Sequence, residues 1–172
     1  MSDQYLDKLV VVDSGPLIAL SIMELLPVLN KLFKKTVLPQ AVLDECLHDV
    51  SKPQSESIQF ALDKGWVTKK SISSTAESLL LAEILDPGEA QAISLAKELD
   101  ALALIDEKAG RKVARREKVQ CIGSLFVLIK AKQGGHIQQV QPALQHLIDH
   151  GYFLDKSLID YVLTVSKEKS KN

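Results

Sequence analysis

Short apolar runs recur along the chain, and each is followed by polar or turn-forming residues. Runs of this length are typical of strands that are buried on both faces of a parallel sheet. The most distinct run covers residues 9–12 and ends at Asp13, before a Ser-Gly-Pro turn. The same pattern predicts four more strands, at residues 36–38, 66–68, 101–105 and 119–122.

Between these runs, apolar residues recur every three or four positions, which indicates amphipathic helices. Proline and glycine mark several helix ends, such as Pro39 before one helix and Gly65 after the next. Strands that alternate with helices predict an α/β fold with a mostly parallel central sheet. The predicted helices are 17–32 with a break at Pro27, 40–48, 54–64, 76–85, 88–99, 108–115, 125–132, 142–150 and 158–165.

The composition is that of an ordinary globular protein, with 172 residues, 46% hydrophobic and 25% charged. This length predicts a single domain over residues 1–172, with a polar tail at 166–172. The formal net charge of -1 provides no overall positive field, although a local basic face remains open. The chain has two cysteines without CxxC spacing, and it shows neither a signal peptide nor a run of roughly 18 apolar residues. These features predict a cytoplasmic protein without a membrane partner.

Four acidic residues occupy positions that a surface role explains poorly. Asp13 and Asp106 directly follow predicted strands, and helical wheels place Glu45 and Glu89 toward apolar faces. An unpaired buried carboxylate costs several kcal/mol, so such acids need a cation or a proton. No matching buried arginine or histidine is evident, and Mg²⁺ or Mn²⁺ prefers oxygen ligands. The pattern therefore predicts a metal site formed by Asp13, Glu45, Glu89 and Asp106.

A basic face follows the last of these acids. Lys108, Arg111, Lys112 and Arg115 recur at helical spacing, which places them on one side of the helix after Asp106. Phosphodiester hydrolysis needs a metal that activates water and cations that hold the nucleic-acid backbone. The combination predicts metal-dependent cleavage of nucleic acid.

Each residue also has an ordinary structural interpretation. Asp13 can form an Asx turn, Asp106 can cap a helix, and Glu45 can simply flank an amphipathic face. The helix dipole favours an acid such as Glu89 in a first turn, and a basic face such as that around Arg111 is often only solvated. The coincidence of four acids favours the metal site over these separate explanations.

Five segments, in this order, resemble a PIN domain: VVDSGPLIAL, VLPQAVLDE, LDPGEAQAISLAKEL, ALALIDEKAGRKVA and VQCIGSLFVLIKAK. The resemblance spans about residues 9–163 and is nearest to the VapC-like branch of prokaryotic proteins. It implies a three-layer α/β/α fold whose acidic pocket binds magnesium or manganese and cleaves single-stranded RNA. By motif, the acids fall on Asp13, Glu45, Glu89 and either Asp106 or Glu107, with Asp106 favoured because it directly follows the strand.

The resemblance also implies a toxin that pairs with an antitoxin protein and forms a homodimer. From the basic face of the helix after Asp106, we expect Arg111, Lys112 and Arg115 to bind RNA. One position departs from the family pattern, because Gly15 stands where many PIN domains carry Ser or Thr. A hydroxyl there would order metal-bound water, a role left to Ser14 or Ser124.

Gly15 keeps a second hypothesis open, that of a catalytically weak or inactive PIN-like module that binds nucleic acid or protein. A phosphatase with an aspartyl nucleophile is disfavoured, because that chemistry generally needs an acid at the position of Gly15.

Overall fold

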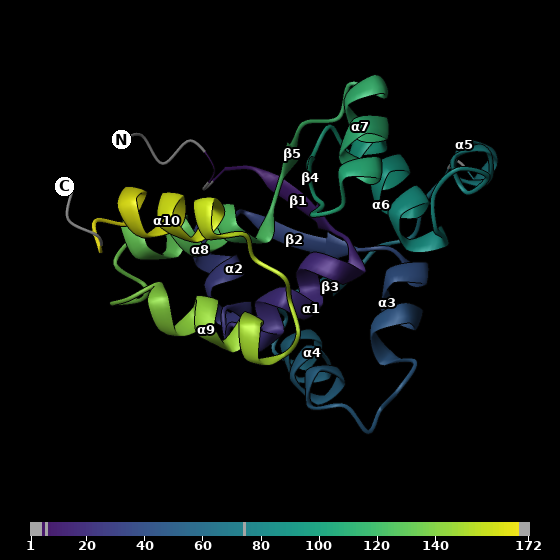
Figure 1. The fold of residues 1–172 in the computed structure, drawn as a ribbon. Helices are drawn as coiled ribbons and strands as arrows, with labels where there is room; N and C mark the ends of the chain where they lie inside the picture. Colours follow the sequence, from purple (N-terminus) through teal and green to yellow (C-terminus); the bar gives the residue numbers. More distant parts are fainter. Residues whose placement is uncertain (1–4, 6, 74, 169–172) are drawn as a thin grey trace.

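The computed structural model describes residues 5, 7–73 and 75–168, which form a parallel sheet covered by helices on both faces (Figure 1). The sheet has the order β3-β2-β1-β4-β5, and every pair of neighbouring strands is parallel. The α/β fold class is thus confirmed. The strands in this part of the chain are β1 (Leu9–Val12), β2 (Lys35–Leu38), β3 (Thr68–Lys69), β4 (Leu102–Leu104) and β5 (Cys121–Ile122).

The helices follow the predicted order, with shifts at their ends. The segment predicted at 17–32 begins already at Ser14, because Pro16 fits the first turn of a helix, and it divides into three pieces. The pieces are α1 (Ser14–Ile22), the 3₁₀ helix η1 (Leu26–Val28) and α2 (Leu29–Leu32). The remaining helices are α3 (Gln40–Leu47), α4 (Pro53–Asp63), α5 (Thr75–Leu81), α6 (Pro87–Glu98), α7 (Lys108–Arg116), α8 (Ser124–Gln133), α9 (Gln141–Asp149) and α10 (Lys156–Val165).

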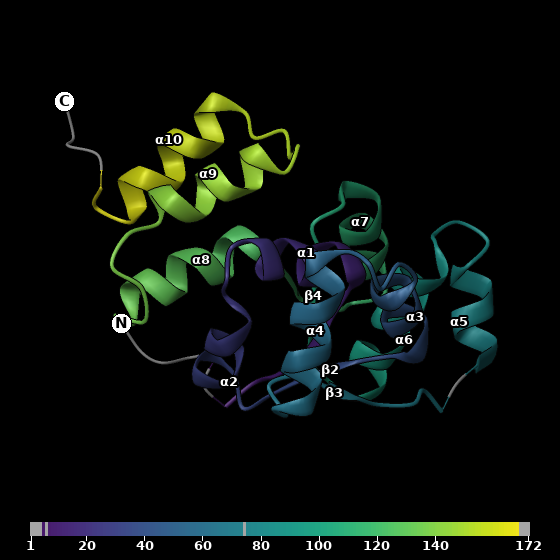
Figure 2. The same ribbon diagram turned by 90° about the horizontal axis from the view of Figure 1, so that it is seen from below.

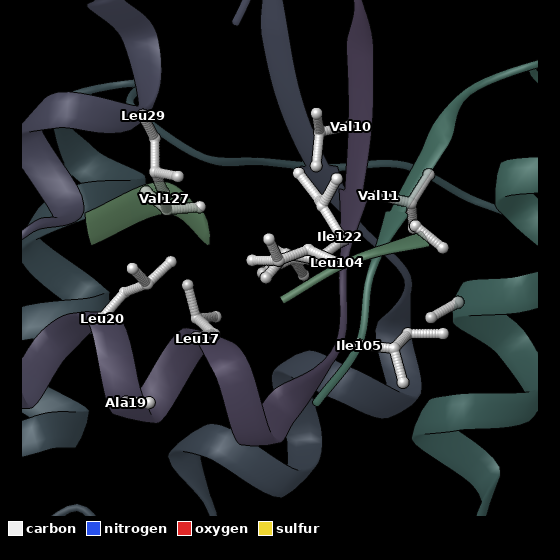
Figure 3. Close-up of a cluster of buried hydrophobic side chains, with 14 of the residues drawn as sticks. Val10, Val11, Leu17, Ala19, Leu20, Leu29, Leu104, Ile105, Ile122 and Val127 are labelled. Carbon is white, nitrogen blue, oxygen red and sulfur yellow. The ribbon is translucent and has the colours of Figure 1, made fainter. Parts of the chain in front are cut away.

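The sheet separates two helical layers. Helices α6 and α7 cover one face, whereas α1, α2 and α8 lie on the other, with α9 and α10 further out (Figures 1 and 2). Figure 3 shows how successive residues of β1 serve both layers, since Val10 points toward Leu17 on α1 and Val11 points to the opposite side. Both side chains are fully buried, as expected for a central parallel strand.

Asp13 lies where the order of the strands in the sheet reverses. The chain passes from β1 to β2 on one side, whereas β4 and β5 lie on the other, so the strand order reverses between β1 and β4. Connections diverge at such a point, and ligands of open α/β sheets bind there, at the carboxyl ends of the strands. Asp13 directly follows β1 and Asp106 follows β4 after one residue, so both lie at this edge.

The C-terminal residues pack against the fold. Ser166 is buried, and Glu168 accepts hydrogen bonds from the backbone N–H groups of Val140 (2.7 Å) and Gln141 (3.2 Å). The predicted polar tail therefore does not begin at 166, and residues 169–172 lie outside the described residues.

The cysteines and the helix lengths complete the description. Cys46 and Cys121 are free thiols, the first buried and the second only partly so. Among the described residues, no single helix is long and apolar enough to cross a membrane. Helix α1 and the segment Leu26–Leu32 reach that length and composition only together, as a pair bent by 109°.

Candidate metal centre

Asp13 is the most deeply buried acid of the site, with a side chain only 3% exposed. Its backbone N–H donates to the Leu104 carbonyl at 3.1 Å, which anchors the residue between β1 and β4. Its Oδ1 atom has no hydrogen-bond partner among the described residues. Burial raises the pKa of Asp13 to about 7, the charges of Glu89, Asp86 and Glu45 add to this rise, and the Ser14 N–H opposes it. A buried carboxylate of this kind favours a bound cation.

Two further carboxylates lie close to Asp13. Glu45 on α3 and Asp86 before α6 each offer one oxygen, and these two atoms and one oxygen of Asp13 all lie within 4.8 Å of one another. None of the three residues forms a salt bridge within the part of the chain that the structure describes. Three hard oxygen ligands at this spacing fit Mg²⁺ or Mn²⁺, which usually completes its shell with water. We call these three residues the acidic cluster.

Glu45 joins the acidic cluster in a way that the helical wheel does not predict. The helical wheel places Glu45 on the inward side of α3, between Ala41 and Val42, but Val42 and Cys46 form the buried side of the helix and Glu45 itself is not buried. The Glu45 side chain instead crosses to α6, where its Oε1 accepts a hydrogen bond of 2.8 Å from the Gly88 N–H. A Cβ atom on Gly88 would lie 2.3 Å from Glu45 Oε2, so only glycine permits this approach.

Asp86 is the acid that sequence reasoning missed. It is the N-cap of α6, and its Oδ1 accepts a hydrogen bond of 2.9 Å from the Glu89 N–H. Capping fully explains an Asp before Pro-Gly-Glu, so the sequence pattern alone indicates only a helix start. One signal was available: Asp86 lies only three residues before Glu89, a predicted site residue. A carboxylate that caps a helix with one oxygen still has a second oxygen for a cation.

Glu89 lies beside the acidic cluster, and its inward orientation is confirmed by an exposed fraction of 5%. Its Oε1 has no hydrogen-bond partner among the described residues and faces α7, where a Cβ atom on Gly110 would lie 2.4 Å away. Burial raises the pKa of Glu89 to about 7, with further contributions from the charges of Asp86, Glu107 and Glu45. At a pH equal to this pKa, the Glu89 carboxyl group is protonated in half of the protein molecules, a property suited to proton transfer.

Asp106 is not part of the acidic cluster. It is exposed, and its Oδ1 accepts a hydrogen bond of 2.8 Å from the Ser124 N–H at the start of α8. A Cβ atom on Gly123 would lie 3.0 Å from both Asp106 Oδ1 and Arg111 Nη1, so these two side chains lie over Gly123. The charge of the neighbouring acid, Glu107, contributes to the raised pKa of Glu89. Asp106 and Glu107 therefore both border the site and differ in what they contact.

The basic residues lie on the side of α7 that faces away from the core. Gly110, Val113 and Ala114 form the buried side of the helix. Arg111 is half-buried and donates from Nη1 to the Ile105 carbonyl at 3.4 Å. The exposed members of this face are Lys108, Lys112 and Arg115. Contact between Gly110 and Glu89 joins this cationic helix to the acids.

The structure shows the surroundings of Gly15 and of the two serines, Ser14 and Ser124, that could supply the hydroxyl missing at Gly15. Gly15 lies in the first turn of α1, is exposed, and has no atom within 4 Å of an added Cβ. A serine would fit there without displacing any neighbour. Of the two alternatives, Ser14 directs its backbone N–H at the Asp13 carboxylate, whereas Ser124 is buried with its backbone N–H bound to Asp106.

Comparisons with known proteins concern the family and the fold of the chain. The DUF3368 family model, described as a PIN domain, matches residues 9–168. Among solved structures, the chain is similar to a PilT N-terminus domain protein from the hyperthermophilic archaeon Sulfolobus solfataricus, with 22% sequence identity, a TM-score of 0.54, and coverage of 72% of this chain and 92% of that one. It also matches a domain of a functionally unknown protein from Methanocaldococcus jannaschii, with 17% identity, a TM-score of 0.45, and coverage of 67% and 90%. None of the curated proteins compared with the chain matches it.

Proposed function

Since this chain belongs to the PIN domain family, a nuclease-type fold, we propose that it is a metal-dependent endoribonuclease that cleaves single-stranded RNA. One observation carries the proposal: three carboxylates from different parts of the chain lie together, the buried Asp13 among them, and none forms a salt bridge among the described residues. The three carboxylates repel one another, and a bound divalent cation would reduce this repulsion.

In the proposed site, Asp13, Glu45 and Asp86 would hold Mg²⁺ or Mn²⁺, which would supply a charge that lowers the pKa of bound water and stabilises the phosphate. The Glu89 carboxylate accepts the proton of the attacking water, because a carboxylate with a pKa of about 7 can accept and release a proton near neutral pH. Asp106 lies outside the group of metal ligands, where it is placed beside Arg111 over Gly123.

The α7 face is proposed to hold the RNA. Arg111, Lys112 and Arg115 would contact backbone phosphates, which gives affinity without sequence preference and makes binding depend on salt. The single-stranded preference rests on the family resemblance and is tested by comparing single-stranded RNA, double-stranded RNA and single-stranded DNA as substrates.

The decisive experiment is cleavage of end-labelled RNA with Mn²⁺, Mg²⁺ or EDTA. We expect Asp13→Asn and Asp86→Asn each to lower the rate by about 100-fold or more, because each removes a ligand charge. The control is Asp44→Asn, since Asp44 lies next to Glu45 on α3 but its Oδ1 accepts a hydrogen bond of 2.6 Å from Gln40. Undiminished cleavage by Asp13→Asn would exclude the proposed site, and a normal rate for Asp86→Asn would remove Asp86 from it.

Gly15 is the observation that favours a second candidate, a module that binds nucleic acid without cleaving it. Calorimetric titration with Mn²⁺ separates the two proposals. A nuclease binds Mn²⁺ and loses affinity when Asp13 is replaced by Asn, whereas an inactive module binds no metal in an Asp13-dependent way.

We further propose a toxin role, with an antitoxin protein as partner and a homodimer as the assembled form. Expression in a bacterial host should then arrest growth, and Asp13→Asn should abolish the arrest. Normal growth with the intact chain would contradict the toxin role, and a monomer in sedimentation analysis would contradict the homodimer.

A further inference from the structure

A second cavity, of about 700 Å³, lies at the opposite edge of the sheet from the acidic cluster. Tyr5 and Phe33, which line it, precede β1 and β2, whereas Asp13 follows β1. Because the strands are parallel, their amino ends face away from the edge that carries the acids. In Figure 1, α2, α8 and α10 lie together on the left, and α3 lies on the right.

The cavity concentrates positive charge in a chain whose formal net charge is -1. No acidic residue is among its described lining residues, whereas four lysines and a histidine are. Lys132 is paired with Glu168 at 3.3 Å, but the other three lysines form no salt bridge within the described part of the chain. The lysines that line the cavity are Lys31, Lys130, Lys132 and Lys167, and the histidine is His136.

Aromatic side chains stand next to these cations. The rings of Tyr5 and Phe126 meet edge to face, with centroids 5.0 Å apart and planes at 75°. The Lys130 Nζ atom lies 5.6 Å from the centroid of each ring. A ligand that carries both a flat ring and a negative charge can therefore use the aromatic surface and the ammonium group together.

Ser166 provides a second kind of observation. Its side chain is 3% exposed and lines the cavity, and its Oγ has no hydrogen-bond partner among the described residues. A buried hydroxyl without a partner is unfavourable, and a hydrogen bond to a ligand would offset this cost.

The aromatic and lysine arrangement alone does not make a site. Phe60 and Trp66 also meet edge to face, with centroids 5.6 Å apart, and Lys64 Nζ lies 5.3 Å from the Phe60 centroid. None of these three residues lines the cavity. The cavity volume, the four lysines and the unpartnered hydroxyl distinguish the group around Lys130, and Lys64 supplies a matched control.

We propose that this cavity binds a nucleoside phosphate. Its phosphate contacts Lys31, Lys130 and Lys167, and its base packs against Tyr5 and Phe126. The volume lies within the range of about 300 to 1,000 Å³ that is usual for small-molecule sites. The acidic cluster takes no part, so this proposal does not depend on the proposed nuclease function.

Calorimetry with adenosine 5′-monophosphate and uridine 5′-monophosphate tests the proposal, using the full chain in EDTA. We expect saturable binding that weakens as salt is raised, and a weaker response to inorganic phosphate alone. Lys130→Gln should weaken binding by about tenfold, since it removes a charged hydrogen bond, and Lys64→Gln should not change it. Phe126→Leu, checked for folding by thermal melting, should weaken nucleotide binding by about tenfold but leave phosphate binding unchanged.

Three results would overturn the proposal: no nucleotide binding, equal effects of the two lysine variants, or equal affinity for inorganic phosphate and the nucleotides. Tighter binding of an acidic peptide that contains an aromatic residue would identify a protein partner instead. RNA cleavage by Lys130→Gln should equal that of the unaltered chain, so the outcome here is distinguishable from failure of the nuclease proposal.

Discussion

Replacement of Asp13 by Asn is expected to stabilise the metal-free protein at pH 8. Burial and neighbouring acids raise the pKa of Asp13 from its ordinary value of 3.8 to about 7. The folded protein therefore binds a proton at Asp13 more tightly than the unfolded chain does. The resulting contribution to stability is complete below about pH 4 and is lost as the pH rises through about 7.

The size of the effect follows from this difference in pKa. Each pH unit corresponds to about 1.4 kcal/mol, so ionised Asp13 costs the folded state about 4 kcal/mol at pH 8. Somewhat more than half of this cost, about 2.5 kcal/mol, develops between pH 5 and pH 8. Asn keeps an oxygen that can accept the Ser14 N–H but carries no charge. We expect a gain of about 2 to 4 kcal/mol, because the buried amide still pays for its own desolvation.

Urea unfolding, followed by circular dichroism at several pH values in EDTA, measures the difference. The two proteins should be of similar stability near pH 4 and diverge as the pH rises. Mn²⁺ should stabilise the unaltered protein at pH 8 but not Asp13→Asn, since a ligand stabilises only the state that binds it. The control is Asp49→Asn, at an exposed acid whose pKa is lowered by hydrogen bonds from Ser51. Parallel pH curves, or a less stable Asp13→Asn at pH 8, would refute the reasoning.

Three more substitutions test the geometry around the site. Gly88→Ala should displace the Glu45 carboxylate, because Glu45 Oε2 lies 2.3 Å from the added Cβ. We expect it to weaken Mn²⁺ binding about tenfold in calorimetry with little loss of stability. The control is Gly15→Ala, whose added Cβ has no atom within 4 Å and which should leave Mn²⁺ binding unchanged. Gly15→Ser should raise Mn²⁺ affinity or the cleavage rate above that of Gly15→Ala, and equal values would show that no hydroxyl is needed there. Arg115→Gln should weaken RNA binding and reduce its salt dependence by about one ion, while Arg116→Gln, outside the basic face, should have the smaller effect; equal effects would contradict an RNA contact limited to that face.

The strands were predictable where apolar content and strand pairing coincide. Residues 9–12 form β1 as expected, because a central strand needs apolar residues on both faces. At the edge of the sheet the two properties separate. Val67 is buried but precedes β3, which begins at Thr68 rather than at 66. Apolar residues indicate burial, and a residue can be buried without joining the hydrogen-bonded ladder.

The acids of the site also differ in how far the sequence predicts their positions. Glu89 was predictable because its helix packs the apolar side against β1 and β4, so the wheel reports its true surroundings. Glu45 belongs to the site through a contact with the amino end of another helix, which no periodicity encodes. Asp86 was hidden because N-capping accounts for it locally. Long side chains and residues with two roles therefore limit what a single sequence reveals about a site.

The amino end of α6 explains how like charges remain together before a cation binds. The N–H of Gly88 binds Glu45, and the N–H of Glu89 binds Asp86, so consecutive amides hold two acids from different elements. The positive end of the helix dipole offsets part of their repulsion. Asp13 receives only the Ser14 N–H and keeps Oδ1 without a partner among the described residues, which leaves it with the cost of burial. A cation bound at this cluster would therefore act mainly on Asp13, which is why its substitution separates metal binding from folding most clearly.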